Sequence, residues 1–220
     1  MRIAALTLLA VLAVGCGGKS TSPSSTTFVT TTITPTAKGC TTVKQPTPGP
    51  RHAPKPTTAL DPAKTYDVRF QTNCGSFTIR LAVKTAPKTA ASFASLVRRG
   101  FFDKTVFHRI VPGFVIQGGD PTASGLGGPG YSVVEAPPTS TRYTLGVAAM
   151  AKASNEPRGA SGSQFFVVTA ADAQLTPDYA LLGNVVAGLP VVKRIGRLGD
   201  PTTQQPTAIV EIERATLVVH

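Results

Sequence analysis

The stretch VFHRIVPGFVIQGGDP, residues 106–121, combines two apolar runs, a turn and a few polar side chains. Residues 106–110 and 114–119 have the composition of short strands, and the Pro-Gly pair between them favours a turn. The polar side chains of the stretch are His108, Arg109, Gln117 and Asp120. No cysteine, serine, lysine or tyrosine stands among them, so the stretch suggests a site that works without an obvious nucleophile.

The segments around this stretch predict further strands and two helices. Period-two alternation predicts strands in residues 65–72 and 75–83, joined by the turn TNCG. Residues 86–100 predict a helix with Pro87 in its first turn and Gly100 at its end, and residues 189–198 a second, short helix. Short strands are expected in residues 145–151, 163–169, 180–186 and 208–219. Many short strands with only two helices favour an antiparallel barrel over an α/β sheet.

The N-terminus has the features of an export signal. Arg2 is followed by the apolar run IAALTLLAVLAVG, which is too short to span a bilayer and predicts a signal peptide over residues 1–15. The segment LAVGC resembles the lipobox of bacterial lipoproteins, which implies lipidation of Cys16 and an extracytoplasmic, membrane-anchored protein. The favoured leucine stands one place early, at Leu12, and Ala13 takes its position. A secreted protein with a small-residue cleavage site is the alternative.

The composition changes sharply after Cys16. Residues 17–60 contain 13 Thr, 4 Ser and 7 Pro and no acidic residue. Such a segment has too little apolar surface to offset its ordering entropy, and its prolines keep it extended. We therefore expect a disordered, lipid-anchored Thr/Pro-rich stalk over residues 16–60 that acts as a flexible tether, and a folded domain over residues 61–220.

Charge and cysteine content restrict the possible partners. The net charge of +11 falls to +5 for residues 61–220, because six basic residues and no acidic ones precede them. No Lys/Arg block marks nucleic-acid binding, although the stalk cations favour an anionic membrane surface. An oxidising compartment makes a disulfide between Cys40 and Cys74 plausible, and two free thiols are the alternative. Two cysteines and three scattered histidines show no metal-ligand spacing, so we expect no metal and no cofactor.

Five motifs carry a family resemblance. FHRIVPGFVIQGGDP, GPGY, AAMAKA, GSQFFVVT and YALLGNV occur in the order and approximate spacing found in cyclophilins, the peptidyl-prolyl cis-trans isomerases. The chain resembles that family over residues 66–219. The resemblance implies a closed eight-stranded antiparallel barrel capped by two helices, and isomerisation of X-Pro bonds in exported polypeptides.

This activity explains why a nucleophile is not needed. Rotation about an X-Pro bond breaks no covalent bond, and its barrier of about 18–20 kcal/mol comes from amide resonance. A fixed donor aimed at the twisted amide and a dry pocket for the proline ring lower that barrier. The resemblance assigns the donor role to Arg109, a pocket wall to Phe114 and the orientation of the arginine to Gln117.

The resemblance also implies a set of substrate-binding positions. Their residues are His108, Val115, Ala151, Lys152, Gln164, Phe166, Gln174, Leu175 and Tyr179. His108 is expected to be a neighbour of the site rather than a base, because no proton is transferred. Gln174 stands where ciclosporin-sensitive members carry tryptophan, so we expect weak ciclosporin binding. A non-catalytic proline-peptide binding module or holdase is the alternative function, and no feature of the sequence calls for more than a monomer.

Overall fold

The computed structural model describes residues 38–220 of the chain. The predicted signal peptide, the lipidation of Cys16 and the part of the stalk before residue 38 lie outside the described residues. Within the described part, no helix is long and apolar enough to cross a membrane.

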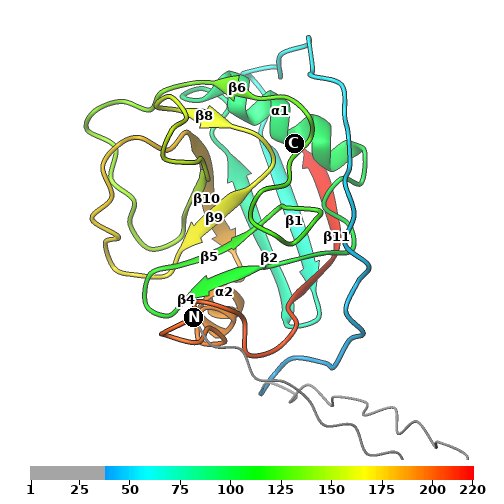
Figure 1. Cartoon of the computed structure of the whole chain (residues 1–220). Helices are drawn as coiled ribbons and strands as arrows, with labels where there is room; N and C mark the ends of the chain where they lie inside the picture. Colours follow the sequence, from blue (N-terminus) through cyan, green and yellow to red (C-terminus); the bar gives the residue numbers. More distant parts are fainter. Residues whose placement is uncertain (1–37) are drawn as a thin grey trace, which may run out of the picture. The chain divides into compact units, whose positions relative to one another are not determined.

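The described chain forms a mainly β domain with two helices (Figure 1). The strands are β1 (Tyr66–Thr72), β2 (Gly75–Leu81), β3 (Thr105–Val106), β4 (Arg109–Val111), β5 (Val115–Gly118), β6 (Val133–Val134), β7 (Val147–Met150), β8 (Ala160–Ser161), β9 (Phe165–Val168), β10 (Leu181–Ala187) and β11 (Glu211–Val219). The helices are α1 (Pro87–Arg98) and α2 (Leu189–Ile195). Nine strands form one antiparallel sheet in the order β3-β11-β1-β2-β10-β7-β9-β5-β4, and β6 pairs with β8 separately. The expected antiparallel β architecture with two helices is confirmed.

The expected closed, eight-stranded barrel is wrong, because the sheet has nine strands and is open. Its two end strands, β3 and β4, are not paired with each other. The predicted strand over residues 106–110 is interrupted at Phe107 and His108, where the backbone changes partner. The Phe107 amide donates to Val210 beside β11, whereas the Ile110 amide donates to Gln204. The ends of the curled sheet are therefore joined by two residues of chain and not by a ladder of hydrogen bonds.

Segments far away in the sequence determine how the first turn of each helix is built. No side chain of α1 itself caps its first turn, but the Glu135 carboxylate accepts hydrogen bonds from the backbone amides of Lys88 (3.1 Å) and Thr89 (2.7 Å). This carboxylate complements the positive end of the helix dipole. At the start of α2, Gly188 has a φ of +77°, and a Cβ there would come 2.3 Å from the Ser76 carbonyl oxygen. Only glycine fits that position.

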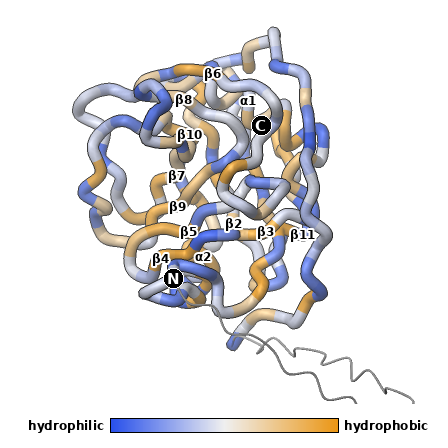
Figure 2. The backbone as a smooth tube through the Cα atoms, viewed as in Figure 1, coloured by the Kyte–Doolittle hydropathy of each residue, from blue (hydrophilic) through white to orange (hydrophobic). Residues whose placement is uncertain are grey.

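The main core fills the concave side of the sheet with aromatic rings. The rings of Phe93 and Phe102 stack with centroids 4.6 Å apart, and Phe70 lies 5.0 Å from Phe77 and 5.2 Å from Phe165. All five side chains are at most 1 % exposed. Hydrophobic colour follows β5, β7 and β9 in Figure 2, because these strands bury residues on both faces.

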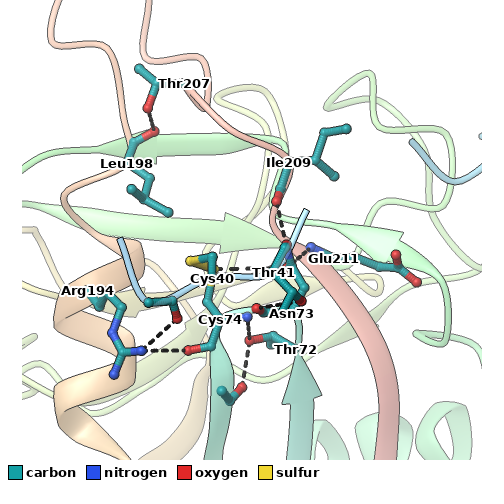
Figure 3. The surroundings of a disulfide bond; sticks show 12 residues. Cys40, Thr41, Thr72, Asn73, Cys74, Arg194, Leu198, Thr207, Ile209 and Glu211 are labelled. Atoms are coloured by element: carbon teal, nitrogen blue, oxygen red, sulfur yellow. Dashed lines mark hydrogen bonds between the residues drawn. A yellow bond between two sulfur atoms is a disulfide. The ribbon is translucent and has the colours of Figure 1, made fainter. Parts of the chain in front are cut away.

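A disulfide joins Cys40 to Cys74, with an S–S distance of 2.02 Å (Figure 3). The expected bridge is thus present, and Cys74 lies in the turn between β1 and β2 as the sequence predicts. The backbone next to the bridge is also ordered by hydrogen bonds. The Thr41 amide donates to the Asn73 carbonyl at 2.8 Å, and the Asn73 side chain donates to the Thr41 carbonyl at 2.8 Å.

Residues 40–60, which we call the strap, follow the surface of the domain without forming a helix or strand (Figure 1). Besides the disulfide, the Arg51 guanidinium donates to the carbonyl oxygens of Phe101 (2.6 Å) and Asp103 (2.8 Å). Leu60 is 8 % exposed and belongs to the main core. The expected flexible tether needs correction here, since these contacts hold residues 40–60 against the domain despite their Thr/Pro-rich composition.

Candidate active site

Period-two alternation in the open end of the sheet separates the main core from a second apolar face. On β4, β5, β7 and β9, one set of side chains points into the main core: Ile110, Ile116, Ala148, Met150, Phe165 and Val167. The residues between them lie on the opposite face. These include Arg109 and Gln117, which are directly paired across β4 and β5, and Phe166, which pairs with Gln117 across β5 and β9. The register of the sheet therefore brings three predicted site residues together.

Arg109 is fixed by two glutamine oxygens. Its Nε atom donates to Oε1 of Gln204 at 2.8 Å, and Nη1 donates to Oε1 of Gln117 at 3.1 Å. Gln204 is 95 residues away in sequence, in the segment between α2 and β11. The guanidinium is always charged and planar, so two anchored N–H groups define the direction of the remaining ones.

A chain of amides continues from the arginine into a glycine-rich loop. Gln117 accepts from Arg109, so its Nε2 atom is free to donate to Oε1 of Gln164 at 3.0 Å. Gln164 in turn donates to the carbonyl oxygens of Gly125 and Gly127, both at 2.9 Å. The side-chain amides of Gln117 and Gln164 are thus each oriented by a partner on either side.

The predicted pocket residues lie beside these hydrogen-bonded amides, in a second hydrophobic cluster. Its buried members are Val115, Tyr143, Val147, Ala149, Phe166 and Val168. Its partly buried members include Phe114, Ala151, Leu175 and Tyr179. The Phe166 and Tyr179 rings meet edge to face with centroids 5.4 Å apart. All six apolar or aromatic residues that the resemblance assigns to the pocket or its edge therefore lie in one patch, next to Arg109 and Gln117.

Tyr143 is a member of this cluster that sequence reasoning missed. Its hydroxyl donates to the Tyr179 carbonyl at 2.5 Å and accepts from the Tyr179 amide at 3.1 Å. Burial raises the pKa of Tyr143 to about 12, so the phenol stays neutral. Tyr143 fixes the backbone that carries the Tyr179 ring, and no motif distinguishes it from an ordinary core tyrosine.

Two of the predicted residues, Lys152 and Gln174, are polar and stand next in sequence to members of this cluster. The Lys152 ammonium donates to the carbonyl oxygens of Ala153 and Glu156, both at 3.1 Å, and lies 5.9 Å from the centre of the Tyr179 ring. Gln174 is exposed, has a φ of +52°, and donates its backbone amide to the Asp172 carboxylate.

His108 occupies a different environment from Arg109. It lines a small cavity of about 240 Å³, and Gln45, Phe107 and Gln205 also contribute to the lining. Both ring nitrogens are buried. Burial lowers the pKa of His108 and Arg109 adds to that effect, whereas the Asp120 carboxylate and the Gln164 side chain oppose it. The neutral form of the His108 ring is therefore favoured.

Asp120 organises the glycine-rich loop over residues 119–131. Its buried carboxylate accepts hydrogen bonds from the amides of Thr122 (2.7 Å), Ser124 (3.0 Å), Gly125 (2.6 Å) and Gly127 (3.1 Å), and from the Thr122 hydroxyl. Burial acts to raise the pKa of Asp120, but these hydrogen bonds outweigh it and hold the pKa below its ordinary value. The loop binds its own carboxylate with the amides that a phosphate-binding loop would offer to a ligand.

Comparisons with known proteins agree with this geometry. Residues 67–217 match the family model for the cyclophilin type peptidyl-prolyl cis-trans isomerase/CLD. The chain is 37% identical over 156 residues to peptidyl-prolyl cis-trans isomerase-like 1 of Aspergillus fumigatus, covering 69% of this chain and 95% of that protein. It is 35% identical over 156 residues to peptidyl-prolyl cis-trans isomerase CYP18-2 of Arabidopsis thaliana, covering 69% and 93%.

A solved structure has the same fold. The crystal structure of a Cryptosporidium parvum cyclophilin type peptidyl-prolyl cis-trans isomerase, determined in the presence of the dipeptide Ala-Pro, is 31% identical with a TM-score of 0.62. The alignment covers 70% of this chain and 98% of that one. The chain belongs to the cyclophilin family. Its activity is peptidyl-prolyl cis-trans isomerisation.

Proposed function

We propose that this isomerase acts on exported polypeptides and that Arg109 donates a hydrogen bond to the X-Pro amide as it twists. The observation that carries the mechanism is the anchoring of Arg109. Its Nε and Nη1 atoms are held by Gln204 and Gln117, whereas Nη2 makes no hydrogen bond within residues 38–220. The two N–H groups of Nη2 on this fixed cation are thus left to meet a substrate.

The chemistry of the bond explains what such a donor achieves. In the planar ground state the proline nitrogen shares its lone pair with the carbonyl group, which gives a barrier of about 18–20 kcal/mol. When the bond twists, the lone pair returns to the nitrogen and becomes a hydrogen-bond acceptor. A donor that is already in place stabilises this state without reorganising, as the donors of an oxyanion hole do.

The apolar patch next to Arg109 supplies the second requirement. Phe114, Phe166 and Leu175 offer a surface on which a proline ring can be removed from water. Water-exclusion around the ring also strengthens the hydrogen bond from the neighbouring arginine, because the local dielectric is lower. The same face of the sheet therefore positions both the apolar surface for the proline ring and the arginine donor.

Export is supported by the disulfide and by the N-terminal sequence. A bridge such as Cys40–Cys74 persists in oxidising compartments and is rare in the cytosol. The run before Cys16 reads as a secretory signal, and LAVGC as a lipidation site. The proposal is therefore an isomerase held outside the cytoplasmic membrane by a lipid on Cys16, where newly exported chains fold.

The test uses the full chain and a protein whose refolding is limited by proline isomerisation. We expect acceleration by the wild type and a loss of about a hundredfold in Arg109→Ala, the typical effect of removing one preorganised donor. Arg109→Lys should recover only part, because an ammonium cannot keep both glutamine contacts and still reach the substrate. Thermal unfolding of each variant controls for stability. Equal acceleration by the wild type and Arg109→Ala would rule out the donor mechanism while leaving the activity.

The cellular part of the proposal needs its own measurement. Metabolic labelling with a radioactive fatty acid should mark the wild-type chain and not Cys16→Ser, and fractionation should find only the wild type with membranes. Labelling of Cys16→Ser to the same extent would contradict lipidation at Cys16. Release of the unlabelled wild type into the medium would instead support simple secretion.

A further inference from the structure

A cavity of about 880 Å³ opens beside the amide chain of the active site. Gln117 and Gln164 contribute to its lining, together with Ala151 and Lys152. The cavity therefore begins where the proposed proline site ends. Its volume is in the range of sites that bind ligands larger than a single side chain.

One wall of this cavity comes from the strap. Two backbone hydrogen bonds attach the strap to the glycine-rich loop: the Gly49 amide donates to the Pro121 carbonyl, and the Ala53 amide to the Pro129 carbonyl, both at 3.0 Å. The three residues between these attachments, Pro50, Arg51 and His52, all line the cavity.

Arg51 and His52 are held there in different ways. The Arg51 guanidinium is bound to two carbonyl oxygens of the segment after α1, which fastens the strap to the domain. The His52 ring packs on Gly130, since a Cβ at Gly130 would come 2.7 Å from the His52 Nδ1 atom. His52 is nevertheless exposed, so one side of its ring is accessible at the cavity rim.

Other residues of the cavity lining offer both apolar and hydrogen-bonding groups. Ala151, Lys152 and Ala153 form an edge after β7, and the Lys152 ammonium is tied to that segment. Leu126, at the tip of the glycine-rich loop, is 93% exposed and also lines the cavity. An apolar side chain that is fully in water beside a substrate site gains free energy when a ligand covers it.

We propose that the strap contributes one wall to the subsite for the part of the polypeptide next to the isomerising proline, and that His52 contacts the side chain held there. The inference rests on the proposed use of the neighbouring face for proline. The strap lies before residue 67, where the family match begins, so this wall is a feature of the chain beyond the matched domain. Because His52 and Leu126 both border the cavity, the subsite favours a large side chain over alanine.

The test compares peptides that differ only in the residue beside proline, with alanine or phenylalanine placed first before and then after it. NMR titration of the full chain gives the dissociation constant of each peptide, and exchange spectroscopy gives its catalysed cis-trans rate. The wild type should prefer phenylalanine on one side of the proline. In His52→Ala that preference should fall about fivefold, the scale of one lost aromatic contact, while the alanine peptide is unaffected.

Matched variants separate the subsite from general effects of the strap. Lys55→Ala removes an exposed side chain of the strap outside the cavity lining and should leave the preference unchanged. Arg51→Ala should lower the preference as His52→Ala does, because it loosens the same wall. An unchanged preference in both cavity variants would overturn the proposal, as would an equal loss in Lys55→Ala.

The binding readout keeps this result distinct from the mechanism of isomerisation. Arg109→Ala should lose the catalysed rate for every peptide and keep the ratio of dissociation constants. If the catalysed rate survived in Arg109→Ala, the donor mechanism would fail, yet the ratio of dissociation constants would still decide the role of the strap.

Discussion

Arg109 shows how a single side chain can be prepared for a reaction that needs no proton transfer. Its partners come from two places, Gln117 on the neighbouring strand and Gln204 in the segment between α2 and β11. Gln204 is also bound through its backbone, since its carbonyl oxygen accepts from the Ile110 amide at 3.0 Å. Main-chain and side-chain contacts therefore lock Gln204 to β4, and Gln204 acts as a positioning residue for the arginine.

Gln204→Ala should lower kcat for a proline peptide about fivefold and leave its dissociation constant nearly unchanged. The reason is the loss of one charge-assisted hydrogen bond, worth about 1 kcal/mol, that fixes the guanidinium without touching substrate. Rates and affinities from NMR exchange and titration check this split. Gln204→Glu, which keeps an oxygen acceptor, should retain most of the activity, and the neighbouring Gln205→Ala should retain all of it. A rise in the dissociation constant equal to the fall in kcat would contradict a positioning role.

His108 should make the stability of the domain fall in mild acid. Burial holds its pKa below the usual 6.5, with Arg109 adding to the effect and Asp120 and Gln164 opposing it. Well above pH 6.5 the ring is neutral in both folded and unfolded chains. As the pH falls below 6.5 the unfolded chain binds the proton first, so folding is disfavoured.

Urea unfolding of the wild type and His108→Gln between pH 7.5 and 5 measures this effect. The free energy of unfolding of the wild type should fall relative to that of the variant as the pH decreases. The comparison removes the contribution of His220, which lies 3.5 Å from the Asp67 carboxylate and is present in both proteins. Parallel curves for the two proteins would show that His108 is not the group responsible.

At the scale of elements, the sequence predicted regular segments better than their partners. Period-two alternation identified the long strands, and Pro87 and Gly100 marked the ends of α1. The two-residue strands β6 and β8 show no such period and were missed. The interruption at Phe107 and His108 was also missed, because a buried phenylalanine fits a continuous strand equally well. The contact between Arg109 and Gln204 depends on a fold-back over 95 residues that no local pattern reports.

The glycine-rich loop illustrates how an element is specified by one buried carboxylate. Four backbone amides of the loop converge on Asp120, which leaves little room inside the turn. A Cβ at Gly127 would come 2.0 Å from the Asp120 Oδ1 atom, whereas a Cβ at Gly128 would meet nothing within 4 Å. Of these two adjacent glycines, only Gly127 is therefore required by a lack of space for a side chain.

Gly127→Ala should destabilise the domain by about 2 kcal/mol, the usual cost of forcing a methyl group into a filled site. Because Gln164 binds the Gly127 carbonyl, the same variant should also weaken the binding of proline peptides. Gly128→Ala is the matched control and should change neither quantity. Thermal and urea unfolding measure the stability, and NMR titration the binding. Equal behaviour of the two variants would show that the loop is not packed tightly around Asp120.

At the scale of the whole molecule, the prediction from composition was wrong for residues 40–60. Residues 40–60 have the Thr/Pro-rich composition of a disordered stalk, and composition reports only whether a segment can build a core of its own. The strap instead packs on the surface of the folded domain. Its order depends on Cys40, Arg51 and a few backbone hydrogen bonds to the domain, and these are specific contacts that composition does not record.

Removal of the disulfide should therefore affect stability more than catalysis. The bridge closes a loop with a sequence separation of 34 residues, and loss of that constraint on the unfolded chain corresponds to about 3–4 kcal/mol. Cys40→Ser/Cys74→Ser should unfold at a correspondingly lower urea concentration. Arg109, Gln117 and Phe166 are held by the sheet and not by the strap, so the catalysed rate for an alanine-proline peptide should persist. The preference for a large neighbouring residue should decrease, since one end of the strap is released.

A reducing agent should bring the wild type to the stability of the double variant and leave the double variant unchanged. If reduction did not alter the unfolding midpoint of the wild type, the remaining strap contacts would suffice on their own, and the bridge would have no part in holding the subsite wall.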